Sequence, residues 1–259
     1  MIVSHKHRFI FVHLGRTAGR SLTAALSPHC GRDDIVTPAG QGTGRNHEGF
    51  QRHFSAQQIR DAIGRETFDA YFKFAIERNP WEKIVSRYWA YAGVQHKPLY
   101  KRVPEWLTGK PLTFRQWFNL RILQARFLTF GHYRFPRHYD DYMEDGRPLV
   151  DFIGRYENLA AHLAVISERI GVPIVLDESR GSNRHKERVP YTELFDPRMN
   201  RIVEDWYAKD LAFLGYRFGE APPMDYMEFD REAKEAINSP VLEPSKGLAA
   251  DRLHPPDDR

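Results

Sequence analysis

The chain has 259 residues, 41% of them hydrophobic and 13% aromatic, which suits one packed domain and excludes an intrinsically disordered protein. Its single cysteine, Cys30, excludes an internal disulfide and a cysteine-rich metal site. The net charge of +4 is uneven, because the residues from Gly219 onward hold 5 basic and 10 acidic side chains; the basic remainder suits an anionic ligand, an anionic glycan or nucleic acid, or simply a solubilising surface.

The N-terminal residues lack the apolar segment of a signal peptide. There is also no run of about 18 apolar residues that would indicate a transmembrane helix. We therefore expect a cytoplasmic protein without a membrane span. Residues 1–220 are expected to form one domain, and residues 221–259 an acidic, proline-rich tail that is partly disordered.

The first predicted element is a buried strand at residues 9–12, followed by a glycine turn and a helix. Gly15 and Gly19 flank the turn, and helical character resumes after Ser21. Backbone N–H groups at such a turn, together with the dipole of the following helix, favour a bound anion. Side-chain donors at the same place are Arg16, Thr17 and Ser21.

This turn differs from the phosphate-binding loop of ATP-dependent enzymes, which requires the pattern GxxxxGK[ST]. Gly15 and Gly19 are one residue too close together, and Arg20 stands where the lysine would be. A strand, turn and helix that bind no phosphate remain an alternative at this point.

A second anion site is predicted where the strand at residues 71–76 ends. Arg78 follows this strand, Pro80 opens the next helix, and Ser86 lies one to two turns into it. Both polar side chains can face a ligand at the carboxyl edge of the sheet. Alternatively, Arg78 pairs with a carboxylate in a strand-end turn. Glu77 places an acid beside this site, and the sequence offers no reason for it.

The rest of the chain alternates further strands and helices, which predicts an α/β fold of three layers. Capping boxes open helices at Ser55 and Thr113, Gly64 and Gly171 end helices, and Asp196 with Pro197 opens another. Short strands are expected at residues 35–37, 150–154 and 172–176.

The stretches RFIFVHLGRTAGRSL (residues 8–22) and YFKFAIERNPWEKIVSRYW (71–89), with VDFIGRYENL (150–159), resemble motifs of the sulfotransferases that use 3′-phosphoadenosine-5′-phosphosulfate (PAPS). The resemblance is closest to the branch of Golgi carbohydrate sulfotransferases and their bacterial relatives. It implies a P-loop-type nucleotide fold with a central parallel sheet, PAPS as donor and no metal. It also implies a hydroxyl or amine acceptor on a carbohydrate or glycolipid. The Golgi relatives are membrane-anchored, and because this sequence shows no apolar segment we expect it to depart from them as a soluble bacterial enzyme.

The resemblance also implies residue roles. Arg16 occupies the position of the family's catalytic lysine. Arginine keeps the positive charge but cannot donate a proton at working pH, so we expect Arg16 to act electrostatically. The alternative is that this member of the family is slow or inactive. By this resemblance, Arg78 and Ser86 bind the 3′-phosphate. Arg184 or Lys186, in the basic loop at residues 183–188, closes over that phosphate. Alternatively, the charged side chains of this loop only face solvent. The phosphosulfate-binding turn consists of Gly15, Arg16, Thr17, Ala18, Gly19, Arg20 and Ser21.

The acceptor must lose a proton, and a histidine is the natural base near neutral pH. His53 resembles a family segment in which a histidine is the expected base, with His47 as the second candidate. His13 is expected to bind or pack structurally.

Three other functions compete with a sulfotransferase. An ATP-dependent kinase is disfavoured because no clear magnesium-binding aspartate follows a strand. A non-catalytic nucleotide- or polyanion-binding homologue is open because of Arg16. Nucleic-acid binding is disfavoured because the aromatic residues occupy core positions rather than a stacking platform.

Overall fold

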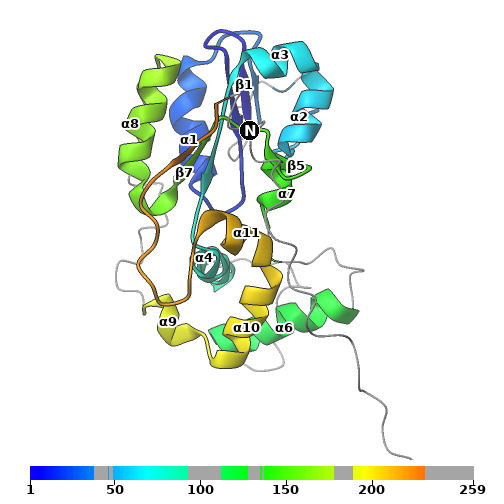
Figure 1. Ribbon diagram of the computed structural model, residues 1–259, viewed down its shortest axis with the longest axis vertical. Helices are drawn as coiled ribbons and strands as arrows, with labels where there is room; N and C mark the ends of the chain where they lie inside the picture. The colour runs from blue at the N-terminus through cyan, green and yellow to red at the C-terminus, as the bar shows by residue number, and fades with distance from the viewer. Residues whose placement is uncertain are drawn as a thin grey trace, which may run out of the picture.

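The structure is a computed structural model of the chain. It describes residues 1–37, 46, 49–92, 112–127, 135, 137–177 and 189–230, without the side chains of residues 125–127. Figure 1 shows a sheet flanked by helices, with a second group of helices below its lower edge.

The main sheet has a parallel centre and antiparallel edges. Its order is β3-β1-β2-β4-β7-β8. The three central strands, β2 (Phe9–Val12), β4 (Phe72–Glu77) and β7 (Phe152–Arg155), run parallel to one another. The outer strands are antiparallel to their neighbours: β1 (Ile2–Ser4) lies between β2 and β3, and β3 (Ile35–Val36) and β8 (Met227–Glu228) form the two edges. The predicted central parallel sheet is therefore confirmed, whereas β1 and the antiparallel edges were not predicted.

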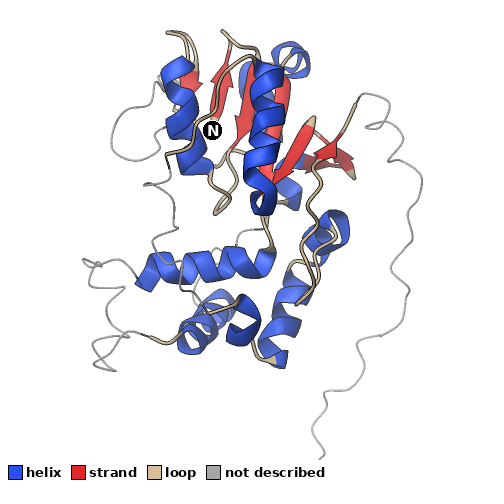
Figure 2. Ribbon diagram, turned by 90° about the vertical axis from the view of Figure 1, so that its left-hand side faces the viewer, coloured by secondary structure: helices blue, strands red, loops and turns tan. Residues whose placement is uncertain are grey.

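Side-chain alternation along β2 divides the core into two layers. Phe9 and Phe11 face helices α1 (Gly19–Leu26) and α8 (Leu159–Ile170) in one cluster of buried apolar residues. Ile10 and Val12 face the opposite cluster, to which helices α2 (Ala56–Ile63) and α3 (Arg65–Ala70) contribute. Helices thus cover both faces of the sheet (Figure 1, Figure 2), as the alternating pattern predicts.

A helical group lies beyond the carboxyl ends of the parallel strands (Figure 1). Trp81, Trp117 and Tyr207 are fully buried in it and join it to the core. Its helices are α4 (Pro80–Ala92), α6 (Phe114–Phe127), α9 (Tyr191–Leu194), α10 (Pro197–Trp206) and α11 (Ala208–Leu214). Short elements complete the described chain: α7 (Tyr139–Tyr142), the hairpin β5 (Met143–Glu144) and β6 (Arg147–Pro148), and the 3-10 turns Ser27–His29 and Tyr156–Asn158.

The predicted helix boundaries follow from local chemistry. Ser55 and Gln58 form the reciprocal capping box of α2, and the Asp196 carboxylate accepts a hydrogen bond of 2.8 Å from the Met199 amide at the start of α10. Gly171 ends α8 in the left-handed conformation that glycine adopts readily.

The strand expected at residues 172–176 is wrong, since these residues, all described, form none. β8 already pairs with the free edge of β7, and Val175 is 79% exposed. β8 lies beyond residue 220, so the sheet includes part of the segment assigned to the acidic tail; residues 231–259 of that tail lie outside the described chain. No helix within the described ranges has both the length and the apolar content that crossing a bilayer requires.

Candidate functional site

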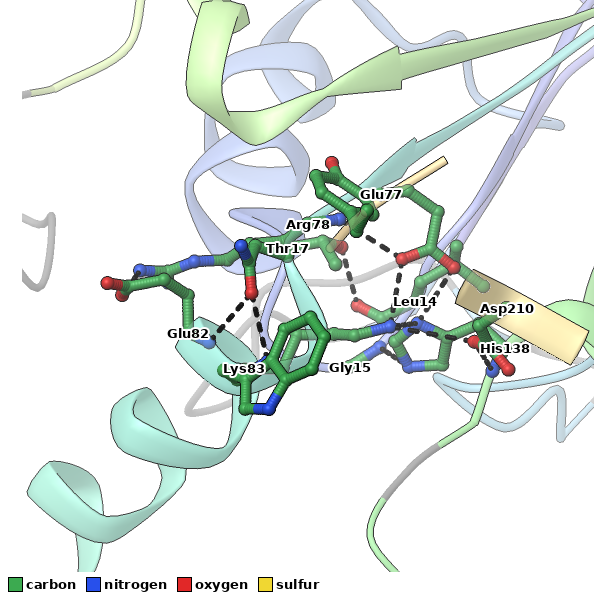
Figure 3. Close-up of polar contacts among 12 residues, drawn as sticks. Leu14, Gly15, Thr17, Glu77, Arg78, Glu82, Lys83, His138 and Asp210 are labelled. Carbon is green, nitrogen blue, oxygen red and sulfur yellow. Dashed lines mark hydrogen bonds and ion pairs between the residues drawn. The ribbon is translucent and has the colours of Figure 1, made fainter. Parts of the chain in front are cut away.

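The two predicted anion sites lie at the same edge of the sheet. Val12 of β2 pairs with Ala75 of β4, and Gly15 and Arg78 each follow three residues later. Because the strands are parallel, both segments leave the sheet at its carboxyl end. Figure 3 shows the first turn and the start of α4 side by side.

The first turn has a strained backbone. Arg16 and Ala18 have φ of 72° and 66°, in the left-handed region that non-glycine residues avoid. Such residues cost about 1–3 kcal/mol each and concentrate at ligand sites. The Thr17 side chain points inward, because its hydroxyl donates to the Leu14 carbonyl at 3.1 Å and the residue is 1% exposed. Thr17 therefore braces the turn and does not present its hydroxyl outward.

Gly19 is required by space rather than by backbone conformation. A Cβ at this position would lie 2.0 Å from Cδ2 of the His13 ring. That ring is buried and stacks on Phe11 at 5.7 Å between centroids. Burial, reinforced by the N-terminal amine and His53, lowers the pKa of His13 to about 2. His13 is thus a neutral packing residue, which agrees with the structural role expected from the sequence.

Helix α1 opens directly from this turn with its first amides uncapped. Ala18 occupies the N-cap position and has no side-chain oxygen to accept from them, and the first turn contains no acidic residue. The first N–H groups of a helix have no intrahelical partner, and together with the helix dipole they favour an anion. The amides at the start of α1, those of Gly19 and Ser21 among them, are therefore candidate anion donors.

Four arginines bring positive charge to this helix end. Burial lowers the pKa of Arg16, and the charges of Arg87, Arg20 and Arg78 lower it further. Like charges this close indicate a site built for an anion. The sequence reasoning missed Arg87; the signal was its position next to Ser86 on the same helix.

Arg78 is held rigidly at the end of β4. It is 7% exposed, and its guanidinium lies 4.1 Å from the centroid of the Tyr156 ring. Its Nη2 donates to Glu82 at 2.9 Å, so the carboxylate pairing considered as an alternative does exist. Its Nε is buried and makes no hydrogen bond within the described chain. Ser86, 7% exposed, lies on the helix that follows, so Arg78 and Ser86 are the candidate anion-binding side chains at this strand end.

The third motif supports the second. Glu157 accepts from the Asn79 amide at 2.8 Å and from the Tyr216 hydroxyl at 2.9 Å. The Arg155 side chain is engaged in another contact, because its Nε donates a hydrogen bond to the Asp225 carbonyl at 2.7 Å. This segment therefore fixes the Arg-Asn-Pro turn.

His53 lies beside the first turn. Its Nδ1 is 2.9 Å from the His13 carbonyl oxygen, and the two rings are 4.9 Å apart. Because a carbonyl only accepts, Nδ1 carries the proton and Nε2 has the lone pair. Desolvation lowers the pKa of His53, and the hydrogen bond to the His13 carbonyl opposes this shift. His53 as a whole is exposed. A neutral imidazole with an open Nε2 can accept a proton near neutral pH.

A buried polar cluster behind the turn explains Glu77. Its carboxylate lies 3.0 Å from Lys83 Nζ and 3.2 Å from Nδ1 of His138. Burial alone would raise the pKa of Glu77, but Lys83 and His138 outweigh it and hold the pKa at about 2. An acid at a buried strand end signals a charged partner. The sequence contained that signal, but it did not identify Lys83 or His138.

Three candidate residues, His47, Arg184 and Lys186, lie outside the described residues. Within the described residues, no group of three or more His, Cys, Asp or Glu side chains is arranged to hold a metal ion.

Comparison with known proteins assigns the family. The model of the sulfotransferase family matches residues 1–217, which include both strand-end motifs. One relative, an uncharacterised protein of Archaeoglobus fulgidus, is 35% identical over 122 residues, which are 47% of this chain and 86% of the relative. No solved structure gives a significant match. With its paired cationic strand ends and a family match over most of its length, the chain belongs to the sulfotransferase family.

Proposed function

We propose that the protein transfers a sulfuryl group from PAPS to a hydroxyl or amine of an acceptor, and that this acceptor is a carbohydrate or glycolipid. The observation that carries the proposal is that Arg16, on the turn that opens α1, and Arg78 follow the ends of two neighbouring parallel strands. PAPS is anionic at its 5′-phosphosulfate and again at its 3′-phosphate. Two cationic positions at neighbouring strand ends suit such a doubly anionic nucleotide. We also propose that the fold is of the P-loop type.

Each anion site has a separate task in this scheme. The α1 amides and Arg16 hold the phosphosulfate, and Arg78 with Ser86 holds the 3′-phosphate. Sulfuryl transfer requires an aligned acceptor and stabilisation of the negative charge that develops on the departing phosphate. Arg16 supplies positive charge there but no proton, because arginine stays protonated in proteins.

His53 accepts the acceptor's proton at Nε2. Its hydrogen bond to the His13 carbonyl keeps the proton on Nδ1 and turns the basic nitrogen away from the strand. The lowered pKa keeps the ring neutral near pH 7, so the base is ready before substrate binds.

The test is mass spectrometry of products from the purified full chain, ³⁴S-labelled PAPS and a panel of polysaccharides and glycolipids. We expect acceptor masses that carry labelled sulfate, at equal yield with and without a chelator. A parallel reaction with ATP and Mg²⁺ addresses the kinase. Phosphorylated product from ATP alone would establish a kinase, and 3′-phosphoadenosine 5′-phosphate (PAP) binding without any sulfated product would establish a non-catalytic binding protein.

A further inference from the structure

We propose that His138 is a positioning residue for the donor turn, and that it ties the position of Gly15 to the strand end that carries Arg78. The inference rests on the proposed function, in which that turn holds the phosphosulfate. His138 belongs to none of the three motifs, and it lies just before α7, far along the chain from Gly15.

The contact between His138 and the turn defines the protonation of the ring. The Gly15 amide donates to Nε2 of His138 at 3.2 Å, and His138 is 1% exposed. Nε2 must therefore have the lone pair, which places the proton on Nδ1, where it donates to Glu77 Oε1 at 3.2 Å. The amide of Gly15 is thus committed to His138, and the anion is left to the amides that follow it.

The ring is held by a buried charged cluster. Lys83 Nζ lies 3.0 Å from Glu77 and 3.7 Å from Asp210, and all three side chains are at most 1% exposed. Asp210 also accepts from the His138 amide at 3.1 Å, so both the backbone and the ring of His138 are fixed. Figure 3 shows Lys83, His138 and Asp210 meeting beside Gly15.

The same carboxylate reaches both anion sites. Oε2 of Glu77 accepts from the Arg78 amide at 3.1 Å and pairs with Lys83, while Oε1 faces His138, which contacts Gly15. A displacement of the turn would therefore break a hydrogen bond inside a dry, charged cluster, where an unsatisfied group is costly. The cluster fixes the spacing between the sites that bind the two ends of one nucleotide.

Two substitutions separate positioning from simple packing. In His138→Gln, the side-chain amide reaches as far as Nε2 and can still accept from Gly15. In His138→Asn, the side chain reaches only as far as Nδ1 and leaves the Gly15 amide without its acceptor. The matched control is His162→Asn, because His162 is also buried and accepts from a backbone amide, that of Arg155, at 2.8 Å.

The first readout is hydrogen exchange of the Gly15 amide, measured by NMR on the nucleotide-free full chain. The second is the Kd of PAP by calorimetry. For His138→Asn we expect exchange to accelerate by about 10-fold or more and the Kd to rise by about 10-fold, as loss of one buried hydrogen bond implies. His138→Gln should stay within about 3-fold of wild type in both, and His162→Asn should leave both unchanged.

Unchanged exchange at Gly15 in His138→Asn would overturn the proposal, as would a His138→Gln protein that behaves like His138→Asn. If His138→Asn does not fold, exchange in wild type decides the matter, because a Gly15 amide that exchanges as fast as an unprotected amide would overturn the proposal. If wild type does not bind PAP, the proposed function fails, whereas the exchange result still shows whether His138 sets the turn.

Discussion

The two anion sites are built in opposite ways. The first consists of main-chain amides on a strained turn, in which Arg16 and Ala18 both have positive φ. The second consists of the Arg78 side chain, which is packed on Tyr156 and whose turn is fastened by Glu157. The second site is therefore held by residues of the second and third motifs, whereas the first also depends on His138, which lies outside all three motifs.

We propose that the first site performs the chemistry and that the second supplies nucleotide affinity. Strain of about 1–3 kcal/mol per residue is kept only where surrounding contacts offset it, and it commonly marks the place where a reaction occurs. Substitutions near the turn should therefore lower kcat, and substitutions near Arg78 should weaken donor binding.

The largest effect is expected at His53. His53→Ala should lower kcat by about 100- to 10,000-fold while PAP affinity stays close to wild type. In wild type, activity should fall as the pH drops through a pKa below the ordinary histidine value of 6.5, because protonated His53 cannot accept a proton. A pH–rate profile of both proteins tests this, and an acidic limb that persists in His53→Ala would exclude His53 as the base.

The second-largest loss of activity is expected on substitution of Arg16. Arg16→Ala should lower kcat by about 100-fold or more, because charge on the departing phosphate loses its stabilisation. Arg16→Lys keeps the charge and should retain most of the activity. Single-turnover rates with PAPS separate this step from release, and unchanged turnover in Arg16→Ala would remove Arg16 from the mechanism.

Arg78→Ala should act on binding. Loss of a charge-assisted contact of about 1.5–3 kcal/mol should weaken PAP by about 10- to 100-fold. Glu82→Gln is the matched control, because it removes the carboxylate that pairs with Arg78 and should leave PAP affinity equal or tighter. PAP affinity that is insensitive to Arg78→Ala, measured by calorimetry, would refute the assignment of the 3′-phosphate site.

The smallest effect is expected at Gly19. Gly19→Ala places a methyl group 2.0 Å from the His13 ring, and overpacking of this kind costs about 1–3 kcal/mol. Urea unfolding should show this loss, and the double variant Gly19→Ala/His13→Ala should recover part of it. If the double variant is no more stable than Gly19→Ala, the clash with His13 is not the reason for the glycine.

The strands at residues 9–12, 71–76 and 150–154 could be predicted because their apolar runs are bounded by turns and feed helices with clear caps. β1 could not, since a strand of three residues is too short to show a period of its own. Arg16, Arg20 and Arg78 could be predicted from local pattern, whereas Arg87 was missed. The contact between Gly15 and His138 could not, because only the folded chain brings together residues so distant in sequence.

The most direct measurement compares the affinity of PAP with that of 5′-AMP, which lacks the 3′-phosphate, for wild type and Arg78→Ala. If two cationic sites bind opposite ends of one nucleotide, wild type should prefer PAP by about 10-fold or more and Arg78→Ala should lose that preference. Equal affinity of wild type for both nucleotides, or a preference that survives in Arg78→Ala, would contradict the account.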